Sequence, residues 1–393
     1  MAPALDINSS PFITPPAKLT SSKSYTSHTN HTNSTSTTMS KPPILRTPSH
    51  PLTLSFTTLD VFTSTPYTGN PLALIRIPST LRTLITQQQK QNIATEFNLS
   101  ETIFLHEQLD RSTSIPEWDV EIFTTDAELP FAGHPVIGAA AYVLGVLGAG
   151  GGNGRGKGRF GTRAGGVDIA LVYDDERDID DEDGEGVIEP NMSTRVSADI
   201  PHNVHIHSHT IGDLERPIPG LSLLPGIRKA ELDAPIVSIV RGMSFLLVRL
   251  GSLEELADVQ LVGEDVSFHG VLDEGWRMGF VAKYYFVVLE GEGSYSDSGG
   301  VMKIRSRMLE VAMEDPATGS AASALSCFLA LCGGDYGRRR FEVTQGVEMG
   351  RKSVIGVEVF VGEGLGRGEE GRRVEGVRIS GNAVVVMEGN LRV

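Results

Sequence analysis

Two short stretches, far apart in the chain, decide the fold that we expect. Residues 131–140 read FAGHPVIGAA, and residues 313–321 read MEDPATGSA. Aligned on Pro135 and Pro316, both follow one pattern: a polar residue, proline, two variable residues, glycine, a small residue and alanine. Proline is favoured at the first position of a helix. Each stretch therefore predicts a helix start, with His134 and Asp315 as the N-cap residues.

The helices that follow these two starts are expected to be buried. Residues 136–147 and 317–331 are apolar on every side, and a helix without a polar face belongs in a protein interior. Two such helices, each entered through an ionisable residue, predict two related halves that face one another. Free backbone N–H groups and the positive dipole end at each helix start would favour a bound carboxylate or another anion.

The composition is globular, with an acidic balance. Hydrophobic residues make up 40% of the chain and charged residues 21%, and the net charge is −15. Nucleic acids and anionic membranes are disfavoured as partners because both require a basic face. No apolar run reaches the ~20 residues of a membrane span, and residues 1–6 lack the features of a secretory signal. We therefore expect a cytoplasmic protein.

The two cysteines, Cys327 and Cys332, both fall in or at the end of the second buried helix. Residues five apart on a helix do not share a face. A disulfide framework and a zinc site built on these thiols are therefore disfavoured, and we interpret both as small packing residues.

Changes in composition divide the chain into segments. Residues 1–48 are rich in Ser, Thr, Pro and Asn and predict a disordered tail. Residues 50–200 and 230–393 carry strand patterns and predict an N-terminal and a C-terminal half, with a last strand that can return to the first half. Within the first half, residues 148–190 join a glycine-rich run to an acidic run, which predicts a flexible surface insertion that can be excised.

A histidine-rich stretch lies between the two halves and contains His202, His205, His207 and His209. Strand alternation would place the last three on one face, where they could hold a metal ion. Only Asp199 or Asp213 lies near enough in sequence to complete such a site. Since histidine-rich loops are often merely exposed, we expect no metal site here.

Three ionisable residues are candidates for chemistry. Glu101 lies at a predicted helix-to-strand junction, and a carboxyl group can act as both acid and base where burial brings its pKa towards neutrality. His134 is not a favoured N-cap residue, so its position suggests a functional role. Bland interpretations remain open: Glu101 as a surface glutamate, Asp315 as a helix cap, and Ser320 as a small packing residue.

These segments resemble the phenazine-biosynthesis PhzF-like family, which has the diaminopimelate-epimerase fold. The matching strings are DVF at 60–62, GNP at 69–71, NLSET at 98–102, ELPFAGHP at 128–135, EDPATGSA at 314–321 and QGVEMGR at 345–351. The resemblance runs from about residue 52 to the C-terminus. The glycine-rich, acidic and histidine-rich segments depart from the family pattern.

The resemblance implies an α+β fold of two pseudo-symmetric halves, each a β-barrel around a buried central helix, with the active site in the cleft between them. Family members of known activity isomerise a dihydro-hydroxyanthranilate by moving a proton, without a metal ion or an organic cofactor. The acid/base glutamate of the family maps onto Glu101, and its supporting residues map onto His134 and Asp315. Contacts with the substrate map onto Ser100, Gly133, Gly319 and Ser320.

We therefore expect an isomerase that acts on a small carboxylic acid without a cofactor, forms a homodimer and binds neither nucleic acid nor membranes. Two alternatives stay open: an epimerase or racemase of the same fold, and a catalytically silent ligand-binding protein. The thiol epimerases of this fold use two cysteines at the cleft. Because Cys327 and Cys332 lie within one predicted helix, a two-thiol mechanism is disfavoured.

Overall fold

The computed structural model describes most of the chain beyond the N-terminal tail. The described residues are 52–107, 115–149, 156–173, 194–214, 218–264, 266, 268, 270–277, 279–289, 300–311, 313–364 and 371–393. The predicted tail and much of the predicted insertion, residues 150–155 and 174–190, lie outside these ranges. No helix within the described ranges is both long enough and apolar enough to cross a bilayer.

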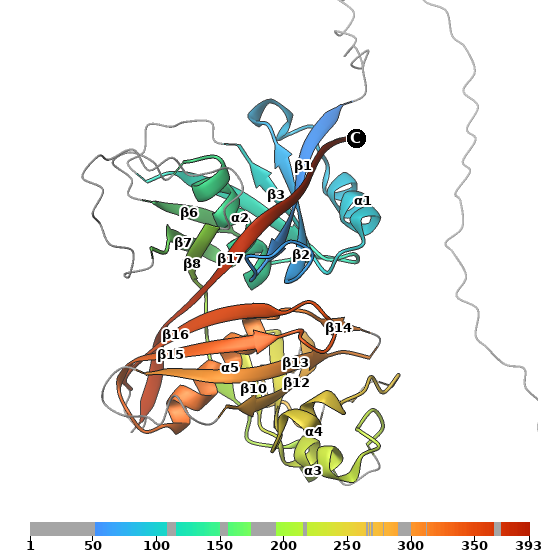
Figure 1. Cartoon of the computed structure of the whole chain (residues 1–393), viewed down its shortest axis with the longest axis vertical. Helices are drawn as coiled ribbons and strands as arrows, with labels where there is room; N and C mark the ends of the chain where they lie inside the picture. Colours follow the sequence, from blue (N-terminus) through green and yellow to red (C-terminus); the bar gives the residue numbers. More distant parts are fainter. Residues whose placement is uncertain are drawn as a thin grey trace, which may run out of the picture. The chain divides into compact units, whose positions relative to one another are not determined.

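The first half is a β-barrel with one helix inside and another packed outside (Figure 1). Its elements are β1 (Thr53–Val61), β2 (Asn70–Ile77), η1 (Ser79–Leu81), α1 (Gln87–Phe97), β3 (Thr102–His106), β4 (Glu117–Phe123), β5 (Glu128–Leu129), α2 (Gly133–Ala141), the π-helix η2 (Tyr142–Val146), β6 (Lys157–Thr162), β7 (Gly165–Leu171) and β8 (Thr194–Asp199). Most of its longer strands are rich in β-branched and aromatic residues, which suit a pleated and largely buried surface.

The second half contains a similar set of strands around a second central helix. Its elements are β9 (His205–Ile206), η3 (Ile211–Asp213), α3 (Pro225–Asp233), β10 (Ile236–Val240), β11 (Met243–Arg249), α4 (Leu253–Ala257), β12 (Phe280–Val288), β13 (Val301–Leu309), β14 (Glu314–Asp315), α5 (Gly319–Cys332), β15 (Gly337–Gln345), β16 (Ser353–Glu363) and β17 (Arg372–Arg392).

The two halves repeat one order of strand pairing. In the first, β1–β2 is antiparallel, β2–β3 parallel, β3–β4 antiparallel, β4–β6 parallel and β6–β7 antiparallel. In the second, the pairs β10–β11, β11–β12, β12–β13, β13–β15 and β15–β16 follow the same alternation. The predicted pseudo-symmetric α+β fold is thereby confirmed.

Strand β17 belongs to both halves (Figure 1). Its first part pairs with β16, its middle pairs with β8, and its last part pairs with β1 from Ala383 to Arg392. Among the described strands, the pairings β7–β8, β8–β17 and β17–β1 close the first half into a barrel of eight strands. The C-terminus of the chain therefore holds the first barrel closed.

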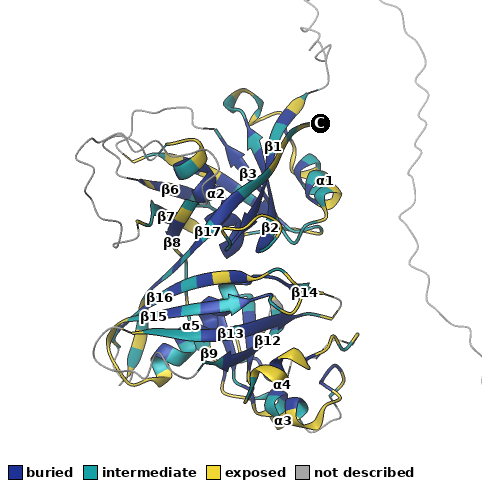
Figure 2. Cartoon of the chain, viewed as in Figure 1, coloured by how far each residue is buried: buried dark blue, intermediate teal, exposed yellow. Residues whose placement is uncertain are grey.

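The central helices α2 and α5 are buried as their sequences predict (Figure 2). Every residue of α2 is buried, and small side chains allow the strands to approach the helix closely. Gly138 is an example, since a Cβ atom added there would lie only 2.4 Å from Cδ2 of Leu72 in β2. The glycine is therefore required by packing against the barrel wall.

Strand pairing also fixes how the two helix starts correspond. Leu129 in β5 pairs with Ile122 in β4, and Asp315 in β14 pairs with Met308 in β13. From these positions the chain continues for the same number of residues to the first residue of α2 and of α5. Leu129 and Asp315 are therefore equivalent positions.

The predicted alignment of the two helix starts on Pro135 and Pro316 is wrong. The strand register makes Pro130 the equivalent of Pro316, so that Gly133 and Gly319 open the two helices. The first half carries prolines at both 130 and 135, and the pattern of residue types fits the second proline by coincidence. Hydrogen bonding between strands, which residue patterns do not reveal, decides the register.

The predicted insertion at residues 148–190 is wrong in its middle part. Residues 157–171 form the β6–β7 hairpin, a part of the barrel wall in which Phe160 and Val167 are fully buried. A Cβ atom at Gly158 would lie 2.8 Å from Cζ3 of Trp118, so this glycine makes room for the indole. Glycines that serve packing therefore look like linker glycines in the sequence.

This hairpin generates a prediction about stability. Phe160→Ala should lower the free energy of unfolding by about 3–5 kcal/mol, because it removes a buried ring that packs against Trp118 and leaves a cavity. Urea denaturation measures the change, and Lys157→Ala, an exposed position on the same strand, serves as the control. Equal stability of the two variants would show that the hairpin is not part of the core.

Candidate active site

The site is organised by the meeting of the two helix starts. An ideal Cβ position at Gly133 lies 3.4 Å from Cα of Gly319, and the reverse distance is 3.5 Å. The first turns of α2 and α5 are thus in van der Waals contact. Small residues at both positions allow the two backbones to come this close.

Neither helix start is capped by a side chain. The N-cap residues are Ala132 and Thr318, and neither accepts a capping hydrogen bond through its side chain. The first N–H groups of a helix have no partner within the helix. Two adjacent helix starts therefore direct free donors and positive dipole ends towards the same region, which is suited to an anion such as a carboxylate.

The prediction that His134 and Asp315 are the N-cap residues is wrong. His134 is the second residue of α2, and Asp315 lies in strand β14, before the N-cap of α5. Both residues are nevertheless at the helix starts, as the sequence predicts. Their surroundings differ from those of a helix cap.

Asp315 is buried and fully engaged by hydrogen bonds. Nδ2 of Asn70 donates to Oδ1 at 2.8 Å, and the hydroxyl group of Thr318 donates to Oδ2 at 2.6 Å. Burial, and secondarily the nearby Glu101, raise the pKa of the carboxyl. Each carboxylate oxygen thus already accepts one hydrogen bond, and these bonds hold the side chain between Asn70 and Thr318.

Gln345 fixes the backbone of Asp315 and the side chain of Thr318 by hydrogen bonds. It is completely buried, and its Nε2 donates to the backbone oxygen of Asp315 at 2.8 Å and to the Thr318 hydroxyl at 2.9 Å. Its Oε1 accepts hydrogen bonds from the Thr318 backbone N–H and from the hydroxyl of Tyr284. The amide is therefore saturated, and it fixes β14 to the start of α5.

Asn70 and Gln345 are hydrogen-bond partners of Asp315 that the sequence did not single out. Both belong to strings that match the family pattern, GNP and QGVEMGR, which is the signal that could have identified them. Asn70 comes from the first half and bonds to Asp315 of the second half. It therefore connects the two halves directly at the site.

A second link between the halves fixes the backbone beside Asn70. The guanidinium of Arg351 donates to Oδ1 of the buried Asp60 at 2.7 Å and to the carbonyl oxygens of Gly69 and Thr68 at 2.8 and 3.1 Å. Gly69 adopts a φ of 69°, which glycine permits without strain. Since Asn70 follows directly, the Arg351 clamp positions the residue that holds Asp315.

Glu101 lies where a helix turns into a strand. Helix α1 ends at Phe97, its C-cap residue Asn98 takes the left-handed conformation with a φ of 51°, and β3 begins at Thr102. The short connection leaves the Glu101 side chain only 18% exposed, with Oε2 at 3.5 Å from Nδ1 of His134. Burial raises the pKa of the Glu101 carboxyl to about 7, although a hydrogen bond with Ser100 acts in the opposite direction.

His134 is buried and has one ring nitrogen without a partner. Burial lowers its pKa to about 4, against the opposing effect of Asp315, so the imidazole is neutral at physiological pH. Among the described residues, none forms a hydrogen bond with its Nε2 atom. A buried, neutral imidazole with an unpartnered nitrogen therefore lies beside Glu101.

The remaining predicted residues lie around this centre. The Ser100 hydroxyl approaches Oδ1 of Asn70 at 3.5 Å, and Ser320 is the second residue of α5, equivalent to His134 in α2. The cysteines are elsewhere. Cys327 is buried within α5, where burial raises the pKa of its thiol, and Cys332 is an exposed residue at the other end of that helix.

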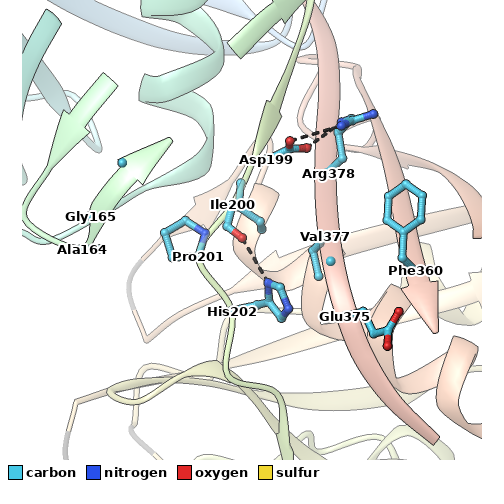
Figure 3. A pocket seen from close by; sticks show the side chains of 12 residues that line it. Ala164, Gly165, Asp199, Ile200, Pro201, His202, Phe360, Glu375, Val377 and Arg378 are labelled. Carbon is cyan, nitrogen blue, oxygen red and sulfur yellow. Dashed lines mark hydrogen bonds and ion pairs between the residues drawn. The ribbon is translucent and has the colours of Figure 1, made fainter. Parts of the chain in front are cut away.

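A separate pocket of about 730 Å³ lies where β17 leaves β16 for β8 (Figure 3). It is lined in part by the turn between β6 and β7, by Phe360 and by Arg378. The guanidinium of Arg378 is held by both carboxylate oxygens of Asp199, at 2.6 and 3.1 Å. None of the candidate site residues lines this pocket, so we do not include it in the active site.

Comparisons with known proteins show which family the chain belongs to. The chain matches the PhzC–PhzF family, described as phenazine biosynthesis-like proteins, over residues 59–389. It is 30% identical to the trans-2,3-dihydro-3-hydroxyanthranilate isomerase of Pseudomonas aeruginosa, over 85% of this chain and 98% of that protein. The predicted family is thereby confirmed.

Two solved structures share the fold. The PhzF-family phenazine biosynthesis protein of Bacillus anthracis superposes with a TM-score of 0.56 at 18% identity, over 87% of this chain and 100% of that one. A hydroxyproline epimerase from Agrobacterium vitis gives a TM-score of 0.50 at 12% identity, over 87% and 93%. The chain therefore belongs to the PhzC–PhzF family of phenazine biosynthesis-like proteins and is an isomerase.

Proposed function

We propose that this isomerase moves a proton on a small carboxylic acid, with Glu101 as the group that removes and returns it. The observation that carries the proposal is the largely buried carboxyl of Glu101, which lies 3.5 Å from His134 at the start of α2, beside two helix starts without side-chain caps; burial raises its pKa to about 7. A general acid and base works best with a pKa near the working pH, because both protonation states are then accessible. No cofactor is needed for such a step.

The helix starts would hold the substrate through its carboxylate. The backbone N–H groups of Gly133 and Gly319, and those of His134 and Ser320 behind them, are the donors at this position. The hydroxyl groups of Ser100 and Ser320 add donors at the rim. The substrate would then lie with its reacting carbon atoms next to Glu101.

The neutral imidazole of His134, beside Glu101, is suited to positioning the substrate. Because the pKa of His134 is lowered to about 4, this ring does not compete for the proton that Glu101 moves. Its unpartnered Nε2 can form a hydrogen bond with a polar group of the substrate. Substrate orientation and proton transfer thus fall to different residues.

The hydrogen bonds of Asp315 favour isomerisation over two-base epimerisation. An epimerase of the two-base type needs a second group that is free to exchange a proton on the opposite face of the substrate. Asp315 is the other acid at this centre, and both of its oxygens already accept hydrogen bonds. Because these bonds restrain Asp315, Glu101 is the better candidate for a single base that removes a proton and returns it to another carbon atom.

The first test is deuterium exchange. In heavy water, the chain should exchange a carbon-bound proton of its substrate, which NMR detects in a panel of small carboxylic acids that includes trans-2,3-dihydro-3-hydroxyanthranilate. Glu101→Gln should lower the exchange rate by about 10² to 10⁴ while the acid still binds. Glu96→Gln, an exposed residue of α1, is the matched control. Exchange at the wild-type rate by the Glu101 variant would refute the mechanism, and binding without any exchange would indicate a ligand-binding protein.

A second prediction concerns the link between the halves. Asn70→Ala removes the donor to Asp315 and to the Ala317 carbonyl, and leaving buried acceptors unpaired should cost about 1–3 kcal/mol of stability and lower turnover. Denaturation in urea and exchange kinetics measure the two effects. Asn92→Ala, an exposed position on α1, should change neither. If Asn70→Ala behaves like this control, Asn70 does not anchor the site.

A further inference from the structure

A second cluster of ligating side chains lies in the C-terminal half, away from the residues of the proposed active site. It consists of His205 in β9, His207 just after it and Asp273, whose donor atoms all lie within 4.8 Å of one another. Nε2 of His205 is 2.8 Å from Oδ2 of Asp273, and Nδ1 of His207 is 4.0 Å from the same oxygen. The fold thus brings in an acid from 66 residues further along the chain.

This arrangement differs from what the sequence suggests. Asp199 and Asp213, the acids that lie nearest to the histidines in sequence, have other partners: Asp199 pairs with Arg378, and Asp213 with His209. The loop that carries Asp273 completes the cluster instead. Our expectation of no metal site in this stretch depended on the histidines being merely exposed, but the side chain of His207 is fully buried.

Hydrogen bonds hold the side chains of His207 and Asp273 in their orientations. Nε2 of His207 lies 2.9 Å from Oγ of Ser238, which in turn lies 2.6 Å from Oγ of Ser244. The second oxygen of Asp273 accepts a hydrogen bond of 2.6 Å from the Ser208 hydroxyl. Metal-binding histidines and carboxylates are typically oriented in this way by groups behind them.

The three residues also leave one side open. The side chain of His207 is fully buried, whereas those of His205 and Asp273 are 30% and 24% exposed. The indole of Trp276 stacks on His205 with ring centres 4.5 Å apart and planes 6° apart. An ion held by the cluster would therefore have protein ligands on its inner side and water on its outer side.

We propose that His205, His207 and Asp273 bind one divalent metal ion of the zinc class. Two imidazoles and one carboxylate form a donor set that suits zinc and its neighbours, with water as a fourth ligand. Binding through Nε2 of His205 requires the neutral tautomer that carries its proton on Nδ1, so the proton between His205 and Asp273 passes to solvent while Nδ1 takes one up from solvent. In the metal-free chain the backbone N–H of Asp273 donates to Nδ1 of His207 at 3.0 Å. The ion would replace this hydrogen bond, and the N–H would then donate to water.

The ion would act as a structural tie. Strand β9 pairs with β10, where Ser238 stands opposite His205. The backbone N–H of His207, just after β9, donates to the carbonyl oxygen of Ile236 in β10 at 2.9 Å, so two of the ligands are attached to the sheet of the second half. The third belongs to the segment of residues 270–277, which contains no helix or strand. We therefore expect the ion to stabilise this segment on the sheet, independently of the proposed chemistry at Glu101.

Titration of the metal-free full chain with Zn²⁺ by calorimetry tests the proposal. We expect saturable binding of one ion and a rise in Tm when Zn²⁺ is added, because a ligand that binds only the folded state stabilises it. His205→Ala and Asp273→Asn should each weaken binding by at least about tenfold and abolish the rise in Tm. His209→Ala, which changes a neighbouring histidine outside the cluster, should leave both unchanged.

Melting curves without metal establish that each variant is folded. Asp273→Asn keeps the size of the side chain and removes only its charge, so weaker Zn²⁺ binding by this variant cannot be due to the cavity that His205→Ala leaves. Two results would overturn the proposal. One is the absence of saturable Zn²⁺ binding by the full chain. The other is binding that weakens less than tenfold in either variant, which would assign the ion to other residues and leave the cluster as a hydrogen-bonded network.

Discussion

The close contact between Gly133 and Gly319 is the constraint on which the rest of the site depends. Two buried helices, one from each half, can meet at their N-terminal ends only if small residues stand there. Because neither start is capped by a side chain, the meeting leaves backbone donors directed at one region. The long strand β17 and the bond from Asn70 to Asp315 keep the two halves together around it.

The burial of Glu101 lowers the stability of the folded chain at neutral pH. The pKa of its carboxyl is about 7 in the folded chain, above the ordinary value of 4.5. Below pH 4.5 the group is protonated in both the folded and the unfolded state, so no cost arises. Between pH 4.5 and 7 the unfolded chain releases the proton more readily, and stability falls by an amount on the order of 3 kcal/mol that is complete above pH 7. A carboxyl with a pKa near 7 is what the proposed proton transfer requires of Glu101.

The sequence predicts the fold, and it predicts that Glu101, His134 and Asp315 lie near one another, because these residues belong to strings typical of one family. The local details were harder to predict. The register of the helix starts depends on the pairing of β5 with β4 and of β14 with β13, and the hairpin at residues 157–171 is hidden by glycines that make room for other side chains. The partners of Asp315 and the approach of Asp273 to the histidines are long-range contacts, which local patterns do not encode.

The most direct test of the account is a titration of the Glu101 carboxyl itself. Carbon-13 NMR of the chain labelled at glutamate carboxyl groups follows each ionisation, and the signal absent from Glu101→Gln identifies the residue. The account predicts a midpoint near pH 7 for this signal. A midpoint near the ordinary value of 4.5 would contradict it, because Glu101 would then be a solvated carboxylate that cannot serve as both acid and base at neutral pH.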